Sequence, residues 1–400
     1  MPGTGGDAER TNTRRRTSRA GGDFLRRAVS FCRSTFGDSS PFCPTGTVTQ
    51  HHESGVCSGP RDMRKSWAPC FLSVIEITLS ITLAGKPRPP KANQPRTSGG
   101  HMTIDAHPTA VAPPIRATVY VGRWPEFPSP FPGPETGTFP PCTSTIVSGP
   151  TEVVLIDAQY LKEDVRDLGD LIERTGKTLT TIYVTHAHPD HYLGIGPLME
   201  RFPDAKCIAL PHIVEAMKEN NEEYAEQFGQ MFGDTVVTGN ALPDPFDGDT
   251  FFVDGSPLKI IEVEQADISP TTIVHIPAID AVVSGDAIYN EIHPMLGLST
   301  ADEWPDWLGT VDVVENLKPR MIVAGHRRPD GDDYAVDMMI QQTRSYIKEF
   351  AAAYNVAKDA QDLIGIMSAK FPHHGNVWTL TFSAFSAIEM RTTAGATSGQ

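Results

Sequence analysis

Three histidines and one aspartate lie within six consecutive positions of this 400-residue chain. They are His186, His188, Asp190 and His191, in the run THAHPDH. Imidazole nitrogen binds zinc, iron, nickel or copper, and carboxylate oxygen accepts the same ions. Since the whole chain has only 13 histidines, this density predicts a metal site. The alternative interpretation is a solvated polar loop.

The element before the run explains its spacing. The apolar stretch Leu179–Val184 predicts a strand. Residues two apart on an extended chain point to the same side, so His186 and His188 can converge on one ion just past the strand end. The proline that follows turns the chain, because it lacks an N–H donor and has a fixed φ. That turn can direct Asp190 and His191 toward a second ion.

Two later segments also place a metal-ligating side chain after an apolar strand. Ala281–Val283 leads into Ser-Gly-Asp286, and Met321–Ala324 leads into Gly-His326. A helix N-cap is the alternative role for Asp286, and His326 alone would be an ordinary polar residue at a strand end. Together with the histidine run, these positions predict a single cage for positive ions.

The order H-x-H-x-D-H, then G-D, then G-H resembles the metallo-beta-lactamase superfamily over about Thr118–His326. The resemblance implies an α/β (α+β) fold, a four-layer αββα sandwich with one or two ions between its sheets. It also implies that Asp157, which ends an early apolar strand, accepts a hydrogen bond behind the ligand loop. It implies that the first ion is held by His186 and His188, and the second by Asp190, His191 and His326. It implies that Asp286 bridges the two ions.

One ligand that the resemblance implies is replaced. Members usually carry a further histidine about nineteen residues before the bridging aspartate, and here Asp267 takes that place. A carboxylate makes the first site more anionic, which favours manganese or iron somewhat more than an all-imidazole set would. We predict Asp267 as a ligand and two divalent ions as the cofactors, zinc first, with manganese or iron as alternatives. If Asp267 does not bind, the protein holds a single ion.

Two ions together predict hydrolysis. A water held between two cations loses its proton near neutral pH, and one cation polarises the substrate oxygen. Asp190 is predicted to be the catalytic residue that orients this nucleophile and carries a proton to the leaving group. Family enzymes that open beta-lactams usually have Cys or Ser where Asp286 stands, so we predict a small carbonyl substrate, namely an ester, lactone or thioester. The alternatives are a mononuclear iron dioxygenase of sulfur compounds and a non-catalytic metal-binding protein.

Charge is divided unevenly along the chain. Residues 1–101 hold 15 Lys+Arg against 7 Asp+Glu, and the remainder holds 19 against 42, a net charge of −23. Such an acidic body would repel phosphate backbones, so we expect a small-molecule substrate and no nucleic-acid partner. Residues 1–101 are rich in Arg, Ser, Pro and Gly, a composition that predicts disorder.

The apolar run Ala68–Ala84 is interrupted by Glu76, so no stable membrane span is expected. A cytoplasmic location is predicted, with a secretory or organellar one if residues 1–101 are a targeting segment. The cysteines form no C-x-x-C pair, which excludes a zinc knuckle. Cys142 and Cys207 fall in expected strands and are predicted to be core thiols.

Three parts of the chain are therefore predicted: a disordered extension over 1–101, a metal-binding domain over 102–330, and a helical extension over 331–400 that packs on the same domain and offers a surface for an oligomer. Outside the ligand set, His275 and His293 are expected at the core or pocket rim, Trp304 and Trp307 at the mouth or in the core, and His373-His374 in a solvated loop. Strands are expected over 116–121, 142–147, 152–156, 179–184, 205–209, 258–263, 272–276, 281–284 and 321–324, and helices over 161–174, 196–201, 211–228, 332–352 and 356–367.

Overall fold

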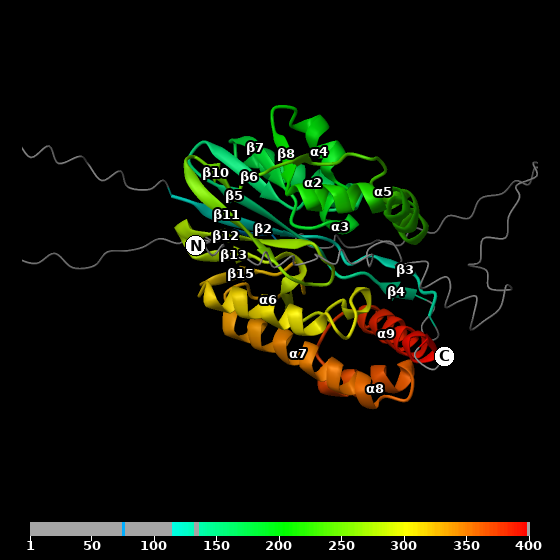
Figure 1. Ribbon diagram of the computed structural model, residues 1–400. Helices are drawn as coiled ribbons and strands as arrows, with labels where there is room; N and C mark the ends of the chain where they lie inside the picture. Colours follow the sequence, from blue (N-terminus) through cyan, green and yellow to red (C-terminus); the bar gives the residue numbers. More distant parts are fainter. Residues whose placement is uncertain (1–73, 77–113, 132–135, 398–400) are drawn as a thin grey trace, which may run out of the picture.

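The structure is a computed structural model, and it describes residues 74–76, 114–131 and 136–397. Within this part of the chain, two sheets pack face to face and helices cover their outer faces (Figure 1). This is the predicted αββα arrangement.

The first sheet supplies the early ligands. Its order in the described residues is β1-β2-β5-β6-β7-β8-β9, antiparallel as far as β6 and parallel from there on. β6 has the sequence EVVLI, and its last four residues are buried, as expected for a strand covered on both faces. The strands are β1 (Val74–Glu76), β2 (Arg116–Val121), β5 (Thr143–Ser148), β6 (Glu152–Ile156), β7 (Thr178–Tyr183), β8 (Lys206–Ala209) and β9 (Asp244–Pro245).

The second sheet supplies the late ligands. Its order is β10-β11-β12-β13-β15, and β13 and β15 are parallel while the other pairs are antiparallel. β14 and β16 form a separate parallel pair, and β3 and β4 form an antiparallel hairpin. The strands are β10 (Thr250–Val253), β11 (Ser256–Val263), β12 (Thr271–Ile276), β13 (Ala281–Val283), β15 (Met321–Val323), β14 (Tyr289–Asn290), β16 (His326–Arg327), β3 (Glu126–Pro128) and β4 (Thr136–Thr138).

The helices that cover the first sheet come earlier in the chain than those that cover the second. α2, α4 and α5 lie beyond the first sheet, and α6 and α7 lie beyond the second (Figure 1). α2 packs through an apolar stripe that includes Val165, Leu168 and Ile172. The helices are α2 (Lys162–Arg174), α3 (Pro189–Tyr192), α4 (Ile195–Arg201), α5 (Pro211–Phe232), α6 (Trp304–Asn316), α7 (Val336–Val356), α8 (Ala360–Lys370) and α9 (Val377–Thr397).

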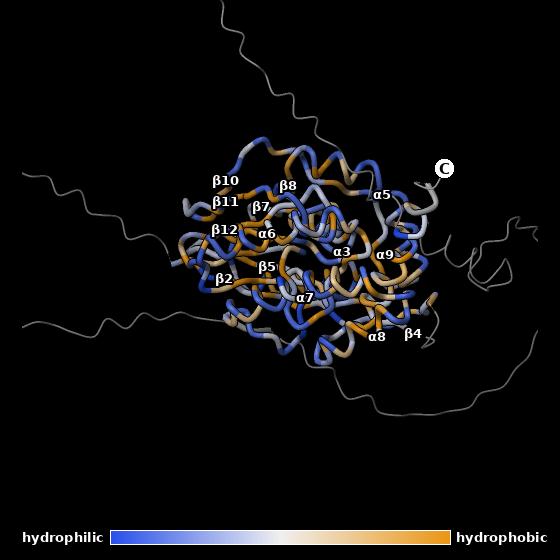
Figure 2. Tube along the Cα trace, turned by 60° about the horizontal axis from the view of Figure 1, so that its bottom comes forward, coloured by the Kyte–Doolittle hydropathy of each residue, from blue (hydrophilic) through white to orange (hydrophobic). Residues whose placement is uncertain are grey.

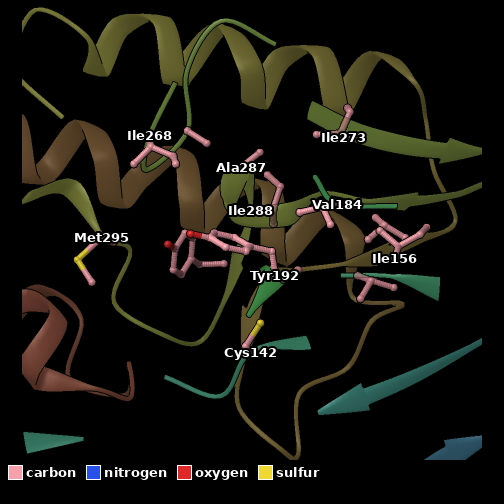
Figure 3. Packing of buried hydrophobic residues seen from close by; sticks show 14 of the residues in the cluster. Cys142, Ile156, Val184, Tyr192, Ile268, Ile273, Ala287, Ile288 and Met295 are labelled. Carbon is pink, nitrogen blue, oxygen red and sulfur yellow. The ribbon is translucent and has the colours of Figure 1, made fainter. Parts of the chain in front are cut away.

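A hydrophobic core fills the space between the sheets. Figure 2 shows hydrophobic stretches along the strands in the interior, whereas α7 carries hydrophilic stretches as well. Figure 3 shows part of this core, with Ile156 of β6 in the first sheet and Ile273 of β12 in the second. Both side chains are fully buried, so the strand ends that carry the ligands are fixed in a rigid interior.

Several predicted elements differ from the observed ones. α6 and α9 were not predicted, and α5 continues to Phe232 instead of ending near 228. α6 includes Thr310, Val311 and Val314, β-branched residues of low helix propensity, so this helix forms through tertiary packing. α9 has little polar–apolar alternation, because much of it is buried in the core.

The amino-terminal extension is largely outside the described residues. Within it, Val74–Glu76 forms the edge strand β1 against β2, which the expectation of a disordered segment did not include. None of the described helices is long and apolar enough to cross a bilayer.

Candidate metal centre

The histidine run lies at the carboxyl end of β7, held by Asp157. This aspartate ends β6 and adopts a positive φ of 63°. Its Oδ1 accepts a hydrogen bond from the backbone N–H of Thr185 at 2.9 Å, and its Oδ2 lies 2.9 Å from His191 Nδ1. Asp157 therefore fixes both ends of the run, in the supporting position that the sequence predicted.

The late ligands lie in three segments that each follow a strand of the second sheet. Asp267 lies in the loop between β11 and β12, Asp286 in a single 3-10 turn after β13, and His326 at the start of β16. A bridge between His186 and Thr271 links the run to this sheet. A Cβ at Gly325 would lie 2.1 Å from Asp286 Oδ1, so only glycine allows the two turns to approach this closely.

The structure brings all seven predicted ligand residues together. Two groups of potential ligand atoms, each within 4.8 Å of one another, have Asp286 in common. The first group joins Asp286 to His186, His188 and Asp267. The second joins Asp286 to His191 and His326, and we add Asp190 to it on the distances that follow. Because Asp286 belongs to both groups, it lies where a bridging ligand would lie.

Asp190 lies between the two groups. Its Oδ1 is 2.7 Å from His188 Nδ1, and its Oδ2 is 3.2 Å from His326 Nε2 and 3.5 Å from His191 Nε2. Asp286 reaches the same two imidazoles, with Oδ1 at 3.1 Å from His191 Nε2 and Oδ2 at 3.2 Å from His326 Nε2. Asp267 is farther out, at 3.9 Å from His186 Nε2 and from His188 Nδ1.

Unpaired polar atoms in this cluster fit a cation. Buried polar groups are nearly always hydrogen bonded, so each exception needs a cause. Here several buried ligand atoms from neighbouring side chains have no partner in hydrogen-bonding geometry, and most of them are acceptors. An ion bound among them would satisfy all of these atoms together. They are His186 Nε2, His188 Nδ1, both oxygens of Asp190, Asp267 Oδ2 and Asp286 Oδ1.

Hydrogen bonds to the remaining ring nitrogens orient three imidazoles. His191 Nδ1 donates to Asp157 Oδ2, and His326 Nδ1 donates to the carbonyl of Pro141 at 3.2 Å. His186 Nδ1 lies 2.8 Å from the hydroxyl of Thr185, which itself lies 3.0 Å from Asp157 Oδ2. In this arrangement all three rings present Nε2 to the cluster, as metal-ligating histidines require.

Charges in the cluster shift the pKa values of its members. Burial raises the pKa of Asp267, the Asp286 carboxylate raises it further, and it reaches about 7. Burial alone would lower the pKa of His326, but Asp286 and Asp190 raise it to about 10. Burial lowers the pKa of His186 well below its usual value. In the metal-free protein, His326 is therefore a cation paired with two carboxylates at neutral pH.

Two contacts of the centre were not predicted. Tyr289 Oη donates to Asp286 Oδ2 at 2.7 Å, and its ring stacks on His326 at 5.5 Å. Cys142 is buried, as predicted for a core thiol, but its Sγ lies 3.8 and 3.7 Å from Nδ1 and Nε2 of His191. The sulfur and His191 also belong to a third group of potential ligand atoms that lie within 4.8 Å of one another. No local pattern marks either residue, because both contacts are long-range or depend on a turn.

The remaining histidines lie away from the two ligand groups. His275 is half-buried in β12, and His293 is buried with Nδ1 at 2.9 Å from Tyr346 Oη. The prediction of a solvated His373-His374 pair is wrong for His374, which is half-buried and stacks on Tyr346. Tyr346 projects from α7, an element that the histidine pair meets only in the folded chain.

The two tryptophans pack in the core. Trp307 Nε1 donates to the carbonyl of Ala287 at 3.0 Å, and Trp304 contacts Phe350 edge to face at 5.3 Å. Both indoles are buried. Core packing is thus the observed role, and the proposed apolar wall at a mouth is wrong.

Comparison with known proteins agrees with this geometry. The family model of the metallo-beta-lactamase superfamily matches residues 137–326, which contain every member of the two ligand groups. Residues 137–326 of the chain belong to the metallo-beta-lactamase superfamily. No curated protein matches the chain.

Two solved structures that match the chain do so at low sequence identity. A metallo-beta-lactamase from Pontibacter korlensis is 17% identical, with a TM-score of 0.43, and the match covers 60% of this chain and 96% of that one. A metallo-beta-lactamase family protein from Thermus thermophilus is 19% identical, with a TM-score of 0.46, and the match covers 69% and 94%.

Proposed function

We propose that this metallo-beta-lactamase superfamily member is a dinuclear metal-dependent hydrolase of small esters, lactones or thioesters. The observation that carries the proposal is the set of buried, unpaired imidazole and carboxylate atoms from His186, His188, Asp190, Asp267 and Asp286. Zinc is the expected ion, because imidazole and carboxylate ligands both suit it. Two bound cations would supply an acidified water as nucleophile and polarise the scissile carbonyl.

Asp190 is proposed as the residue that moves the proton. Its oxygens lie near His188 of the first group and His326 of the second. Burial raises the pKa of Asp190, but His188 and His191 outweigh it and leave that pKa well below its usual value. A carboxylate that stays ionised can orient the attacking water by accepting a hydrogen bond from it, the first step in moving its proton. Asp190→Asn should therefore reduce kcat strongly.

The substrate class follows from the bridging position and the charge of the chain. Asp286 stands where the family's beta-lactam hydrolases usually have Cys or Ser, which supports a different carbonyl substrate. The net charge of −15 for the whole chain disfavours polyanionic substrates.

Metal content provides the first test. Elemental analysis should find about two equivalents of metal per wild-type chain and about one in Asp267→Ala, if each ligand group holds one ion. Asp247→Ala, at an exposed loop aspartate, is the matched control and should keep both. An unchanged count in Asp267→Ala would remove Asp267 from the ligand set, and a wild type without metal would overturn the proposal.

A panel of substrates provides the second test. The metal-loaded chain should hydrolyse members of an ester, lactone and thioester series, and a chelator should abolish the activity. Activity that survives removal of metal would contradict the proposal. Survival of the biological function in Asp190→Asn would indicate the non-catalytic alternative.

One observation favours a second candidate, an iron-dependent dioxygenase of sulfur compounds. His186, His188 and Asp267 together are two imidazoles and one carboxylate, the ligand set of mononuclear non-haem iron oxygenases. This candidate requires about one iron per chain and oxygen consumption with a thiol or persulfide substrate. It leaves the second group without a function, which is why we place it second.

A further inference from the structure

Arg327 is a buried cation directly after the ligand His326. Its side chain is 1% exposed, and its Nη1 lies 2.9 Å from Asp333 Oδ1 and donates to the carbonyl of Gly331. Its Nε and Nη2 are buried without a partner among the described residues. Among the described residues, Asp333 is the carboxylate that forms an ion pair with Arg327. The charge of the guanidinium is therefore compensated by this one residue.

The ion pair closes a loop that begins at the ligand. Arg327 and Asp333 lie at the two ends of the segment 327–333. The Asp333 carbonyl accepts a hydrogen bond from the N–H of Ile322 in β15 at 2.9 Å. On the other side, Asn290 Nδ2 donates to the carbonyl of Asp332 at 3.3 Å. The loop is thereby joined to β15, which leads into the ligand, and to β14, which pairs with the ligand strand β16.

Arg328, the next residue along the chain, forms an exposed ion pair instead of a buried one. Arg328 pairs with Asp330 at 3.1 Å, and their side chains are 38% and 74% exposed. Exposed ion pairs of this kind contribute little to stability, whereas breaking a buried pair leaves an uncompensated charge. Two neighbouring arginines with aspartate partners therefore have opposite expected importance, which makes Arg328 a matched control.

We propose that Arg327 and Asp333 are positioning residues that fix His326 in the second ligand group. His326 and Arg327 form the whole of β16, so a shift of the guanidinium moves the backbone that carries the imidazole. Supporting contacts around metal ligands commonly change metal affinity by about 10- to 100-fold. The inference rests on the proposed function, because it treats His326 as a ligand.

Cobalt titration against a competing chelator would test the inference on the full chain. The binding step lost in His326→Ala defines the second group. Asp333→Asn keeps the shape of the side chain and removes its charge, and it should weaken that step by about 10- to 100-fold while the other step stays within about twofold. Arg328→Met should leave both steps within about twofold of wild type.

A double variant separates positioning from simple stability. Arg327→Met/Asp333→Leu replaces the ion pair with apolar side chains, which often restores or raises stability. In the metal-free state this variant should melt near the wild-type temperature. It should still bind the ion of the second group more weakly than the wild type does. Wild-type affinity at both steps in this variant and in Asp333→Asn would overturn the inference, as would an equal loss at both steps.

The outcomes distinguish this inference from the proposed function. If the wild type binds no cobalt, the proposed function fails. If the wild type binds two ions and Asp333→Asn binds them equally well, only the positioning role fails.

Discussion

The two ligand groups that share Asp286 differ in how firmly the protein holds them. In the second group, His191 is fixed by Asp157 and His326 by the carbonyl of Pro141. In the first group, His186 Nδ1 meets a neutral hydroxyl, that of Thr185, at 2.8 Å, and Asp267 lies 3.9 Å from both histidines. The fold therefore presets the second group, whereas the first would depend on its ion for order. An ion in the second group should bind more tightly for this reason.

Removal of the shared carboxylate should abolish the difference in metal affinity between the two groups. Asp286→Ala takes a ligand from both groups, and we expect both binding steps to be lost. Hydrolysis should fall by about a thousandfold, because metal assistance contributes several kcal/mol and about 1.4 kcal/mol corresponds to tenfold. Metal analysis and kcat/KM check this, and a variant that retains both ions would show that Asp286 does not bridge them.

Removal of the support behind His191 should affect mainly the second group. Asp157→Asn can keep the oxygen that accepts from the N–H of Thr185, but it places an amide NH2 against His191 Nδ1. We therefore expect the second step to weaken by about 10- to 100-fold. Thr185→Val is the counterpart, since its hydroxyl contacts His186 Nδ1 of the first group. Equal losses at both steps in both variants would mean that the groups are not separately held. Competitive titration gives the two affinities.

Acid stability limits the pH range in which the groups can be compared. Burial and the neighbouring His374 lower the pKa of His293 to about 3. Between this value and the usual pKa near 6.5, the unfolded chain binds a proton that the folded chain excludes, so stability falls as pH decreases. We expect a loss of about 2 kcal/mol between pH 6.5 and 5 from His293.

Denaturant unfolding of the metal-free chain across this range would measure the loss. His293→Gln should flatten the slope, although it lowers stability at pH 8 through the packing it disturbs. An unchanged slope would assign the acid sensitivity to other groups.

The pH dependence of metal affinity should sharpen the comparison further. His326 has a pKa of about 10 without metal, and Asp267 a pKa of about 7. An ion entering the second group must displace the His326 proton throughout the neutral range. It must also displace that of His191, because burial lowers the pKa of His191 but Cys142 and Asp190 outweigh it and raise that pKa well above its usual value. The affinity should therefore rise about tenfold per pH unit for each of these protons from 7 to 9. In the first group, the Asp267 proton is lost near pH 7, and its contribution should level off above that value.

Titration calorimetry in buffers of different ionisation heat counts the released protons. His326→Ala should remove the part of this release that His326 contributes and leave the part from His191. A second-step affinity that does not vary between pH 7 and 9 would contradict the assignment.

The ligands were predictable because each follows a short local rule. His186 and His188 come directly after an apolar strand, and Asp286 and His326 follow the same pattern later in the chain. The fold then brings them together, as the resemblance implied. Asp267 lies beside the two early histidines, as predicted for the place of the missing histidine, and its binding of metal stays a prediction.

The supporting contacts could not be predicted, since they join distant parts of the chain. Cys142 meets His191 across 49 positions, and the carbonyl of Pro141 meets His326 across 185. The pair of Arg327 and Asp333 is close in sequence, but its burial arises only when β14 and β15 enclose it. α6 was missed for a related reason, because tertiary packing overrides the weak helix propensity of its residues.

The ligand groups draw on both sheets, so a bound ion would link metal supply to the lifetime of the folded chain. His186 follows β7 of the first sheet, whereas Asp286 follows β13 of the second. An ion shared by such residues would be a removable cross-link between the two halves of the sandwich. Because an ion that binds only the folded state stabilises it in proportion to the logarithm of its concentration, cells short of that ion should lose the protein to proteolysis as well as its activity.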